Sequence, residues 1–249
     1  DPAQIYMDKN DVEFIEKTVK ELGIETTYII KRSRASGKLI FEGKEVTSKI
    51  DGCKFDEEKI LHDSILFKEG SWEAMKKENA ILLSESVAAT LNVDLHDIVL
   101  LETKTSQGQL TVIELQVEGI AVNRSSFGGI TNYINFDYLQ KITELEKDSI
   151  EVYSLFLKNP DMQEIYAQQL ERKIAETHPV TSRDLARTIS PSQPASNVFK
   201  QLEEGKWQGT KFGIATFYDF APQVITFMNT LNGISFGILI VLLVITMIG

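Results

Sequence analysis

Residues 79–122 read NAILLSESVAATLNVDLHDIVLLETKTSQGQLTVIELQVEGIAV and indicate the fold class by themselves. The apolar run Ile81–Leu83 predicts a short buried strand. Ser84 follows it and can cap a helix that extends to Leu91, because a serine hydroxyl accepts hydrogen bonds from the first free amides of a helix. Two further strands are predicted after that helix, over Ile98–Glu102 and Leu110–Val122. Strands and helices therefore alternate in this part of the chain.

The sequence on either side continues the same mixture. We expect a helix capped by Asn10 with Glu13 as its partner, which ends at Gly23. Strands are predicted over residues 24–31, 38–46 (with a turn at Glu42-Gly43), 50–55, 132–135, 150–157 and 179–182. Further helices are predicted over residues 136–145 and 161–177. These elements predict an α+β fold with two subdomains, in which Cys53 is a small buried residue.

Charge is unevenly distributed along the 249 residues. The chain has 26 Lys and Arg against 36 Asp and Glu, a net charge of −10, and Asp219 is the last charged residue. The acidic balance argues against nucleic-acid binding, which needs clustered basic residues. The one basic cluster (Lys31, Arg32 and Arg34) is interpreted as a strand end with a solvated turn.

The uncharged C-terminal part predicts a membrane segment, and with it a division of the chain into three regions. Its apolar residues are numerous enough for a membrane span, which needs about 20, so we expect the start of a transmembrane helix over 223–249. Residues 190–222 are predicted to form a stalk or linker, and residues 1–189 the folded domain. The aromatic residues between 206 and 220 fit either a membrane-interface belt or ordinary packing at the base of the domain.

The sequence predicts neither a catalytic site nor a metal or cofactor site. With Cys53 as the single cysteine, no internal disulfide or thiolate metal cage can form. The histidines (His62, His96 and His178) show no ligand spacing, and no phosphate-binding GxxxxGK[ST] loop occurs. Ser84 and Ser86 have no His or Lys close in sequence to activate them.

Several strings, in order along the chain, resemble the MacB/FtsX-type ABC transporter permeases, including their lipoprotein-releasing LolC/LolE branch. They are DVEFIEKTVKELGI (11–24), ILFKEGSW (65–72), NAILLSESVAATLNV (79–93) with Asp97–Leu100, VEGIAV (117–122), and the stretches 133–139 and 149–160. Two features depart from the family pattern: residues 190–220 are longer than its usual stalk, and Arg183 replaces a common Trp.

The resemblance implies the extracytoplasmic domain of a permease subunit in the bacterial inner membrane. Such subunits lie in the lipid bilayer, form homo- or heterodimers and pair with a cytoplasmic ATPase, so this chain would not itself be an enzyme. Closure of the ATPase would move the outer domain against an extracytoplasmic substrate or carrier protein, a process called mechanotransmission that serves lipoprotein release or export.

In the lipoprotein-releasing branch a protruding hairpin engages a periplasmic carrier. The corresponding candidate here is the turn that contains Thr103, Ser106, Gln107 and Gln109. Two alternative functions remain open: an FtsX-like regulator of a cell-wall hydrolase, and a binding module anchored by a single span.

Overall fold

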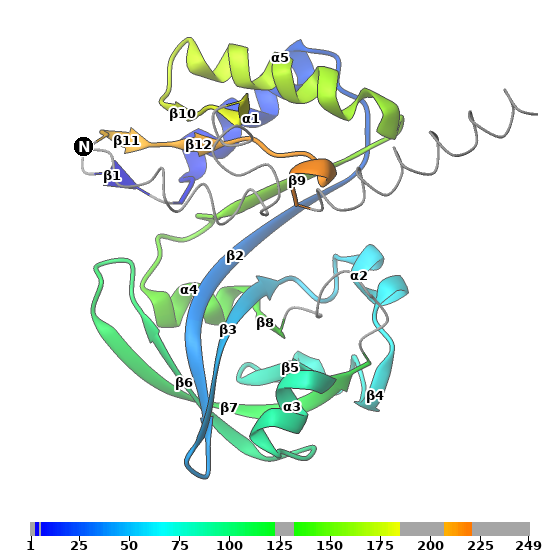
Figure 1. Ribbon diagram of the computed structural model, residues 1–249, viewed down its shortest axis with the longest axis vertical. Helices are drawn as coiled ribbons and strands as arrows, with labels where there is room; N and C mark the ends of the chain where they lie inside the picture. Colours follow the sequence, from blue (N-terminus) through cyan, green and yellow to red (C-terminus); the bar gives the residue numbers. More distant parts are fainter. Residues whose placement is uncertain (1–2, 5, 123–131, 185–206, 221–249) are drawn as a thin grey trace, which may run out of the picture. The chain divides into compact units, whose positions relative to one another are not determined.

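The computed structural model describes residues 3–4, 6–122, 132–184 and 207–220, and these combine strands and helices in an α+β fold (Figure 1). The chain divides into two compact units. Unit 1 comprises Asp1–Gln4, Glu16–Glu25 and Asn159–Gly249, and unit 2 comprises Ile5–Ile15 and Thr26–Lys158. The predicted span over 223–249 lies outside the described residues, and none of the helices in the described part has the length and apolar character to cross a membrane.

Unit 2 is built on strands that pair in a closed ring (Figure 1). The order of pairing is β2–β3–β8–β5–β7–β6 and back to β2. The strands span Thr26–Phe41 (β2), Lys44–Cys53 (β3), Ala80–Ser84 (β5), Ile98–Lys104 (β6), Leu110–Ala121 (β7) and Asn132–Asn135 (β8). Because each of these strands has a neighbour on both sides, the ring satisfies its own backbone hydrogen bonds and forms a small barrel.

Strand β2 is one continuous strand of 16 residues. Its first part, Thr26–Arg32, pairs with β9 (Val152–Leu157), and its second part, Ser33–Phe41, pairs with β3. The hairpin predicted over 38–46 is present, but the predicted break between residues 31 and 38 is not, since both stretches belong to one strand. The small and polar residues between positions 31 and 38 do not show the alternating apolar pattern by which a strand is predicted. One of them, Gly37, is required by close packing, because a Cβ added there would lie 2.6 Å from the Glu102 carbonyl oxygen of β6.

The predicted turn after β2 is confirmed. Glu42 and Gly43 both have positive φ angles, 46° and 79°, as two-residue hairpin turns require. The strand that follows, β3, continues to Cys53, so the separate strand predicted over 50–55 is the end of the same strand. Cys53 is fully buried, as expected, and its burial raises the pKa of the thiol well above its usual value. It is therefore an unreactive packing residue.

Alternate residues of the ring strands fill its interior. Leu39, Ile50, Leu101, Leu115 and Ile134 are fully buried in one cluster. Helices α3 (Glu85–Leu91) and α4 (Phe136–Thr143) add apolar side chains to that cluster. The cap predicted for α3 is confirmed, because the Ser84 hydroxyl accepts a hydrogen bond from the Val87 amide at 3.4 Å.

A second apolar cluster covers part of the outer face of the ring. It joins residues of the strands, such as Leu82 and Tyr133, to Leu61 and Met75. The covering elements are α2 (Lys59–Ser64), β4 (Phe67–Gly70), which pairs with β7, and the 3-10 turn η1 (Ala74–Lys76). Trp72 packs against this cluster and stacks on His62 with ring centres 4.1 Å apart.

Helix α1 (Lys9–Glu21) begins with a cap different from the predicted one. The Asp11 amide donates to Asp8 Oδ1 at 2.9 Å, and the Asp8 amide donates to Asp11 Oδ2 at 3.1 Å. This reciprocal pair takes the place of the predicted Asn10–Glu13 cap. The two carboxylates also interact favourably with the positive end of the helix dipole, which adds to the stability of this cap. Gly23, with φ +65°, follows the helix as predicted.

Unit 1 contains α5 (Gln163–Ala175), which follows the 3-10 turn η2 (Pro160–Met162), and short strands. Strand β1 (Ala3–Gln4) pairs with β11 (Gly209–Thr210), and β10 (Val180–Thr181) pairs with β12 (Phe212–Gly213). A helical turn, α8 (Phe217–Phe220), ends the described part. Phe212 is buried and meets His178 edge-on with ring centres 5.3 Å apart, which favours the packing interpretation for this aromatic.

The barrel predicts losses of stability of different size for two neighbouring leucines of β6. Leu101 is fully buried and Leu100 is 37% exposed, so Leu101→Ala should lower the free energy of unfolding by about 2–5 kcal/mol and Leu100→Ala by about 1 kcal/mol or less. Urea unfolding of the whole chain in detergent micelles measures both. Equal losses for the two variants would contradict the assignment of inner and outer faces.

Candidate functional site on the β6–β7 hairpin

The predicted turn between β6 and β7 is held in one conformation. The strands pair as far as Lys104 and Leu110. Within the turn, the Thr105 amide donates to the Gln109 carbonyl at 2.8 Å, and the Gly108 amide donates to the Thr105 carbonyl at 2.9 Å. Gly108 has φ +80°, a conformation that glycine adopts without strain. The hairpin therefore ends in an ordered turn.

The turn is also attached to the end of α4. The Ser106 amide donates to the Thr143 carbonyl at 2.7 Å, and the Ser106 hydroxyl donates to the Glu144 carbonyl at 2.9 Å. Gln107 and Gln109 are exposed beside it. A partner that meets this turn would bind a preorganised structure, which lowers the entropic cost of association.

The four residues predicted for this turn occupy two different environments. Ser106, Gln107 and Gln109 are at the surface. Thr103 is only 3% exposed, and its hydroxyl donates to the Ser36 carbonyl at 3.0 Å. Thr103 thus ties β6 to β2 and presents no side chain to a partner.

Four aliphatic side chains on the outer face of the hairpin form what we call the hairpin surface: Ile98, Leu100, Leu110 and Val112. They are 53%, 37%, 63% and 53% exposed, respectively. Their outward direction follows from the register, in which Val99, Leu101 and Leu115 point into the core. No helix or loop of the described part covers them as α2 and η1 cover the other side of the ring.

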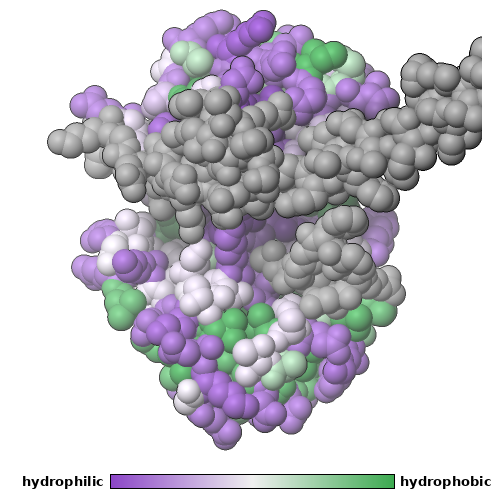
Figure 2. All heavy atoms as spheres, viewed as in Figure 1, coloured by the Kyte–Doolittle hydropathy of each residue, from purple (hydrophilic) through white to green (hydrophobic). Residues whose placement is uncertain are grey.

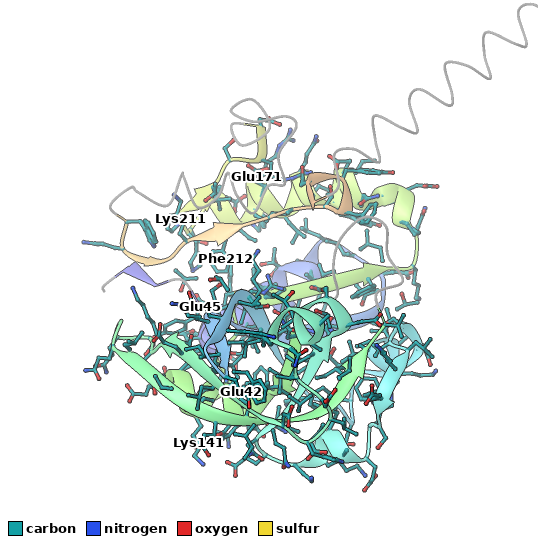
Figure 3. The ribbon with its side chains drawn as sticks, turned by 60° about the horizontal axis from the view of Figure 1, so that its bottom comes forward. Glu42, Glu45, Lys141, Glu171, Lys211 and Phe212 are labelled. Atoms are coloured by element: carbon teal, nitrogen blue, oxygen red, sulfur yellow. The ribbon has the colours of Figure 1, made fainter. Side chains whose placement is uncertain are left out.

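Each aliphatic residue of the hairpin surface lies opposite a polar or charged one. Glu102 lies opposite Val112, and Glu114 lies opposite Leu100. Farther out on the same face, Lys38 pairs with Glu45 at 3.0 Å, and Figure 3 labels Glu45. Figure 2 shows hydrophobic residues (green) among hydrophilic ones (purple) on one face of unit 2. A non-obligate protein-binding surface is, taken as a whole, only about as apolar as the rest of a protein's surface, so this mixed composition is compatible with one.

Sequence reasoning identified the turn but missed the hairpin surface. The signal was present in β6, where Ile98 and Leu100 alternate with Val99 and Leu101, so that both faces of the strand are apolar. A strand with one buried face needs apolar residues on that face alone. Apolar residues on both faces of a strand with one face open to solvent indicate an interface.

A buried ionic network lies where β2 passes from β9 to β3. Arg32 donates to Glu58 Oε2 from Nη2 at 2.6 Å and lies 3.4 Å from Asp51. Arg34 donates to both oxygens of Asp51, at 2.7 and 3.0 Å. Burial lowers the pKa of Arg32, but the hydrogen bond and the charge of Glu58 outweigh burial and raise it overall. Both arginines lie within β2 and not in a turn, so that part of the prediction was wrong, as was the solvation predicted for Arg32, whose side chain is 15% exposed; the Arg34 side chain is 37% exposed.

Glu151 completes this network from the start of β9. Its Oε2 accepts a hydrogen bond from the Arg34 amide at 2.9 Å. Burial raises the pKa of Glu151 from 4.5 to about 7, against the lowering effect of that hydrogen bond. The described residues contain no group of three or more His, Cys, Asp or Glu side chains placed to hold a metal ion.

The raised pKa of Glu151 predicts a pH dependence of stability. The folded protein binds this proton more tightly than the unfolded chain, so the stabilisation is complete below about pH 4.5 and is lost as the pH rises to about 7. Glu151→Gln should remove this loss and be more stable than the parent at pH 8 by roughly 1–3 kcal/mol, since one pKa unit corresponds to about 1.4 kcal/mol.

Urea unfolding at pH 5 and pH 8 tests this, with the exposed Glu146→Gln as the control. If the two substitutions give parallel profiles, Glu151 does not titrate with a raised pKa.

The sequence matches no protein-family model and no curated protein. Among solved structures, the chain is similar to the extracellular domain of the noncanonic ABC-type transporter YknZ from Gram-positive bacteria. The identity is 12% over 69% of this chain and 84% of that chain, with a TM-score of 0.43. It is also similar to the periplasmic region of MacB from Actinobacillus actinomycetemcomitans, at 12% identity over 77% and 84% of the two chains, with a TM-score of 0.38.

A third similar structure is a domain of a permease protein from Porphyromonas gingivalis. Its identity is 11% over 63% of this chain and 68% of that chain, with a TM-score of 0.37.

Proposed function

We propose that this chain is the extracytoplasmic domain of a MacB/FtsX-type ABC permease subunit in the bacterial inner membrane. It couples ATP hydrolysis by a separate cytoplasmic ATPase to the release or export of an extracytoplasmic substrate, and a second permease subunit completes the assembly. The order of the resembling strings along the chain supports this proposal. The uncharged residues 220–249 also support it, since they can supply a membrane segment.

The division of the chain follows from the same proposal. Residues 1–189 are the extracytoplasmic domain, 190–222 connect it to the membrane, and 223–249 begin a transmembrane helix.

The hairpin surface is the observation that carries the proposal, because a domain that acts on another protein needs a place to dock it. Its four aliphatic side chains are about half exposed. Full burial of one such side chain contributes about 1.5–3 kcal/mol, so covering the exposed part of four supplies a few kcal/mol. That amount suits a contact that forms and breaks in each cycle. Gln107 and Gln109 add donors and acceptors that orient the partner.

Purification of the full-length protein from its native membrane, with identification of the proteins that accompany it, tests the proposal. A P-loop ATPase together with lipoproteins or a periplasmic carrier is the expected result. An ATPase together with a peptidoglycan hydrolase would support the FtsX-like role instead. An intact preparation without an ATPase would contradict the permease assignment and leave an anchored binding module.

The hairpin surface predicts a selective loss of partner binding. The double variant Leu110→Ser/Val112→Ser should reduce the amount of accompanying extracytoplasmic protein at least tenfold and leave the ATPase in place, because the surface is exposed and lies outside the core. Quantitative mass spectrometry of the purified complex measures both. Ile165→Ser is the matched control, since Ile165 is an aliphatic residue of α5 with 48% exposure. Equal losses for the control and the double variant would contradict a role for the hairpin.

A further inference from the structure

The last described segment of unit 1, residues 207–220, is attached to the rest of that unit at several points. Its strands β11 and β12 pair with β1 and β10, and the Phe212 amide donates to the Pro179 carbonyl at 2.9 Å. Beyond these backbone contacts, the segment is held by a group of polar side chains that we call the Arg183 clamp: Arg183, Glu164, Thr216 and Asp219.

The clamp centres on the guanidinium of Arg183. Its Nη2 donates to both oxygens of Glu164, at 3.1 and 3.0 Å, and to Asp219 Oδ2 at 3.0 Å. Nε donates to the same Asp219 oxygen at 3.3 Å. Arg183 thereby joins α5, which carries Glu164, to α8, which carries Asp219.

Thr216 completes the group. Its hydroxyl lies 2.7 Å from Glu164 Oε1 and 3.1 Å from Asp219 Oδ2, and its amide donates to Asp219 Oδ2 at 2.7 Å. The Arg183 amide donates to Glu171 Oε1 at 3.1 Å; Figure 3 labels Glu171 on α5 and Phe212 on β12. All these contacts lie within unit 1.

Burial makes the clamp sensitive to the loss of any member. The side chains of Arg183 and Asp219 are 3% and 4% exposed, whereas Glu164 is 33% exposed. Charges removed from water are tolerated only while they are paired and hydrogen-bonded, and removal of one partner leaves the other uncompensated. The clamp therefore holds one arrangement of these side chains.

The clamp connects the end of the described part of unit 1 to α5 by a path much shorter than the chain itself. Asp219 is the last charged residue, and the uncharged residues 220–249 follow it directly. The covalent path from Arg183 to Thr216 runs through residues 184–215, whereas the clamp joins both ends of that path through a few hydrogen bonds. A displacement of Asp219 therefore reaches α5 through Arg183 and through the Thr216 hydroxyl, both of which contact Glu164.

We propose that the Arg183 clamp is the joint that transmits movement of the uncharged C-terminal segment to α5. The inference rests on the proposed function, since it assigns the coupling step of that function to particular residues. Arg183 and Asp219 are positioning residues: they touch no substrate, and they keep residues 216–220 and α5 moving together.

Hydrogen exchange of the whole chain in detergent micelles tests whether the clamp holds the segment. Asp219→Asn should speed the exchange of the Phe212 and Thr216 amides at least tenfold, and leave the amides of β6 and β7 within twofold of the parent. Thr216→Val removes the hydroxyl but keeps the buried charges, so it should raise the exchange rates of these amides by a smaller factor. If Asp219→Asn fails to fold, Thr216→Val tests whether the clamp holds the segment. The exposed Asp161→Asn is the control. Unchanged exchange in residues 207–220 would overturn the inference.

Hydrogen exchange in the complete permease with its ATPase tests the transmission. A non-hydrolysable ATP analogue should change the exchange of α5 in the parent. In Asp219→Asn it should leave α5 unchanged, although ATP hydrolysis stays within twofold of the parent. A response of α5 that persists in the variant would overturn the inference and leave the proposed function standing. Absence of any ATPase from the parent preparation would refute the proposed function, and the coupling role with it, whatever the first experiment shows about the clamp.

Discussion

The double pairing of β2 is the constraint on which unit 2 depends. Residues Gly37–Ile40 have strand neighbours on both sides, β3 and β6, so this one strand closes the ring. Closure removes free edges, and it fixes which residues of every ring strand point inward, since a shift of one residue would expose the whole inner set. The hairpin surface is a consequence of that register. Leu101 lies beside Leu39 in the core, and Leu100 must therefore face out.

The hairpin surface and the Arg183 clamp invert the usual distribution of side chains. Scattered apolar residues on a surface and solvated charges are ordinary, whereas grouped exposed aliphatics and buried charges are informative. In unit 2, aliphatic side chains gather on an outer face without cover among the described residues. In unit 1, the charged residues Arg183 and Asp219 are buried. The first arrangement suits contact with another protein, and the second fixes a connection within the chain.

Local patterns predicted much of the fold. The Ser84 cap, the Glu42-Gly43 turn and the β6–β7 hairpin follow from residue types a few positions apart, and all three were predicted correctly. The continuity of β2 was missed because its middle residues are small or polar and gain their strand neighbours from distant segments. The pairing of Asp8 with Asp11 was missed because the nearby Asn10 is an equally good cap by residue type.

The two features of functional interest differ in how far sequence can reveal them. The four consecutive apolar residues Ile98–Leu101 at the start of β6 place aliphatic side chains on both faces of the strand and could have indicated the β6 part of the hairpin surface. The clamp left no local trace: Glu164, Arg183 and Asp219 are far apart in the chain, and each by itself resembles a solvated charge. Only the fold of unit 1 brings them within hydrogen-bonding distance.

The central claim is that the hairpin surface docks an extracytoplasmic protein, and site-specific photo-cross-linking in intact cells tests it most directly. A photoreactive side chain at Val112, which faces out, should give a defined adduct with an extracytoplasmic protein. The same side chain at Ile113, which packs against the core, or at Ile165 on α5 should give none. Absence of an adduct from Val112, or the same adduct from Ile165, would contradict the claim.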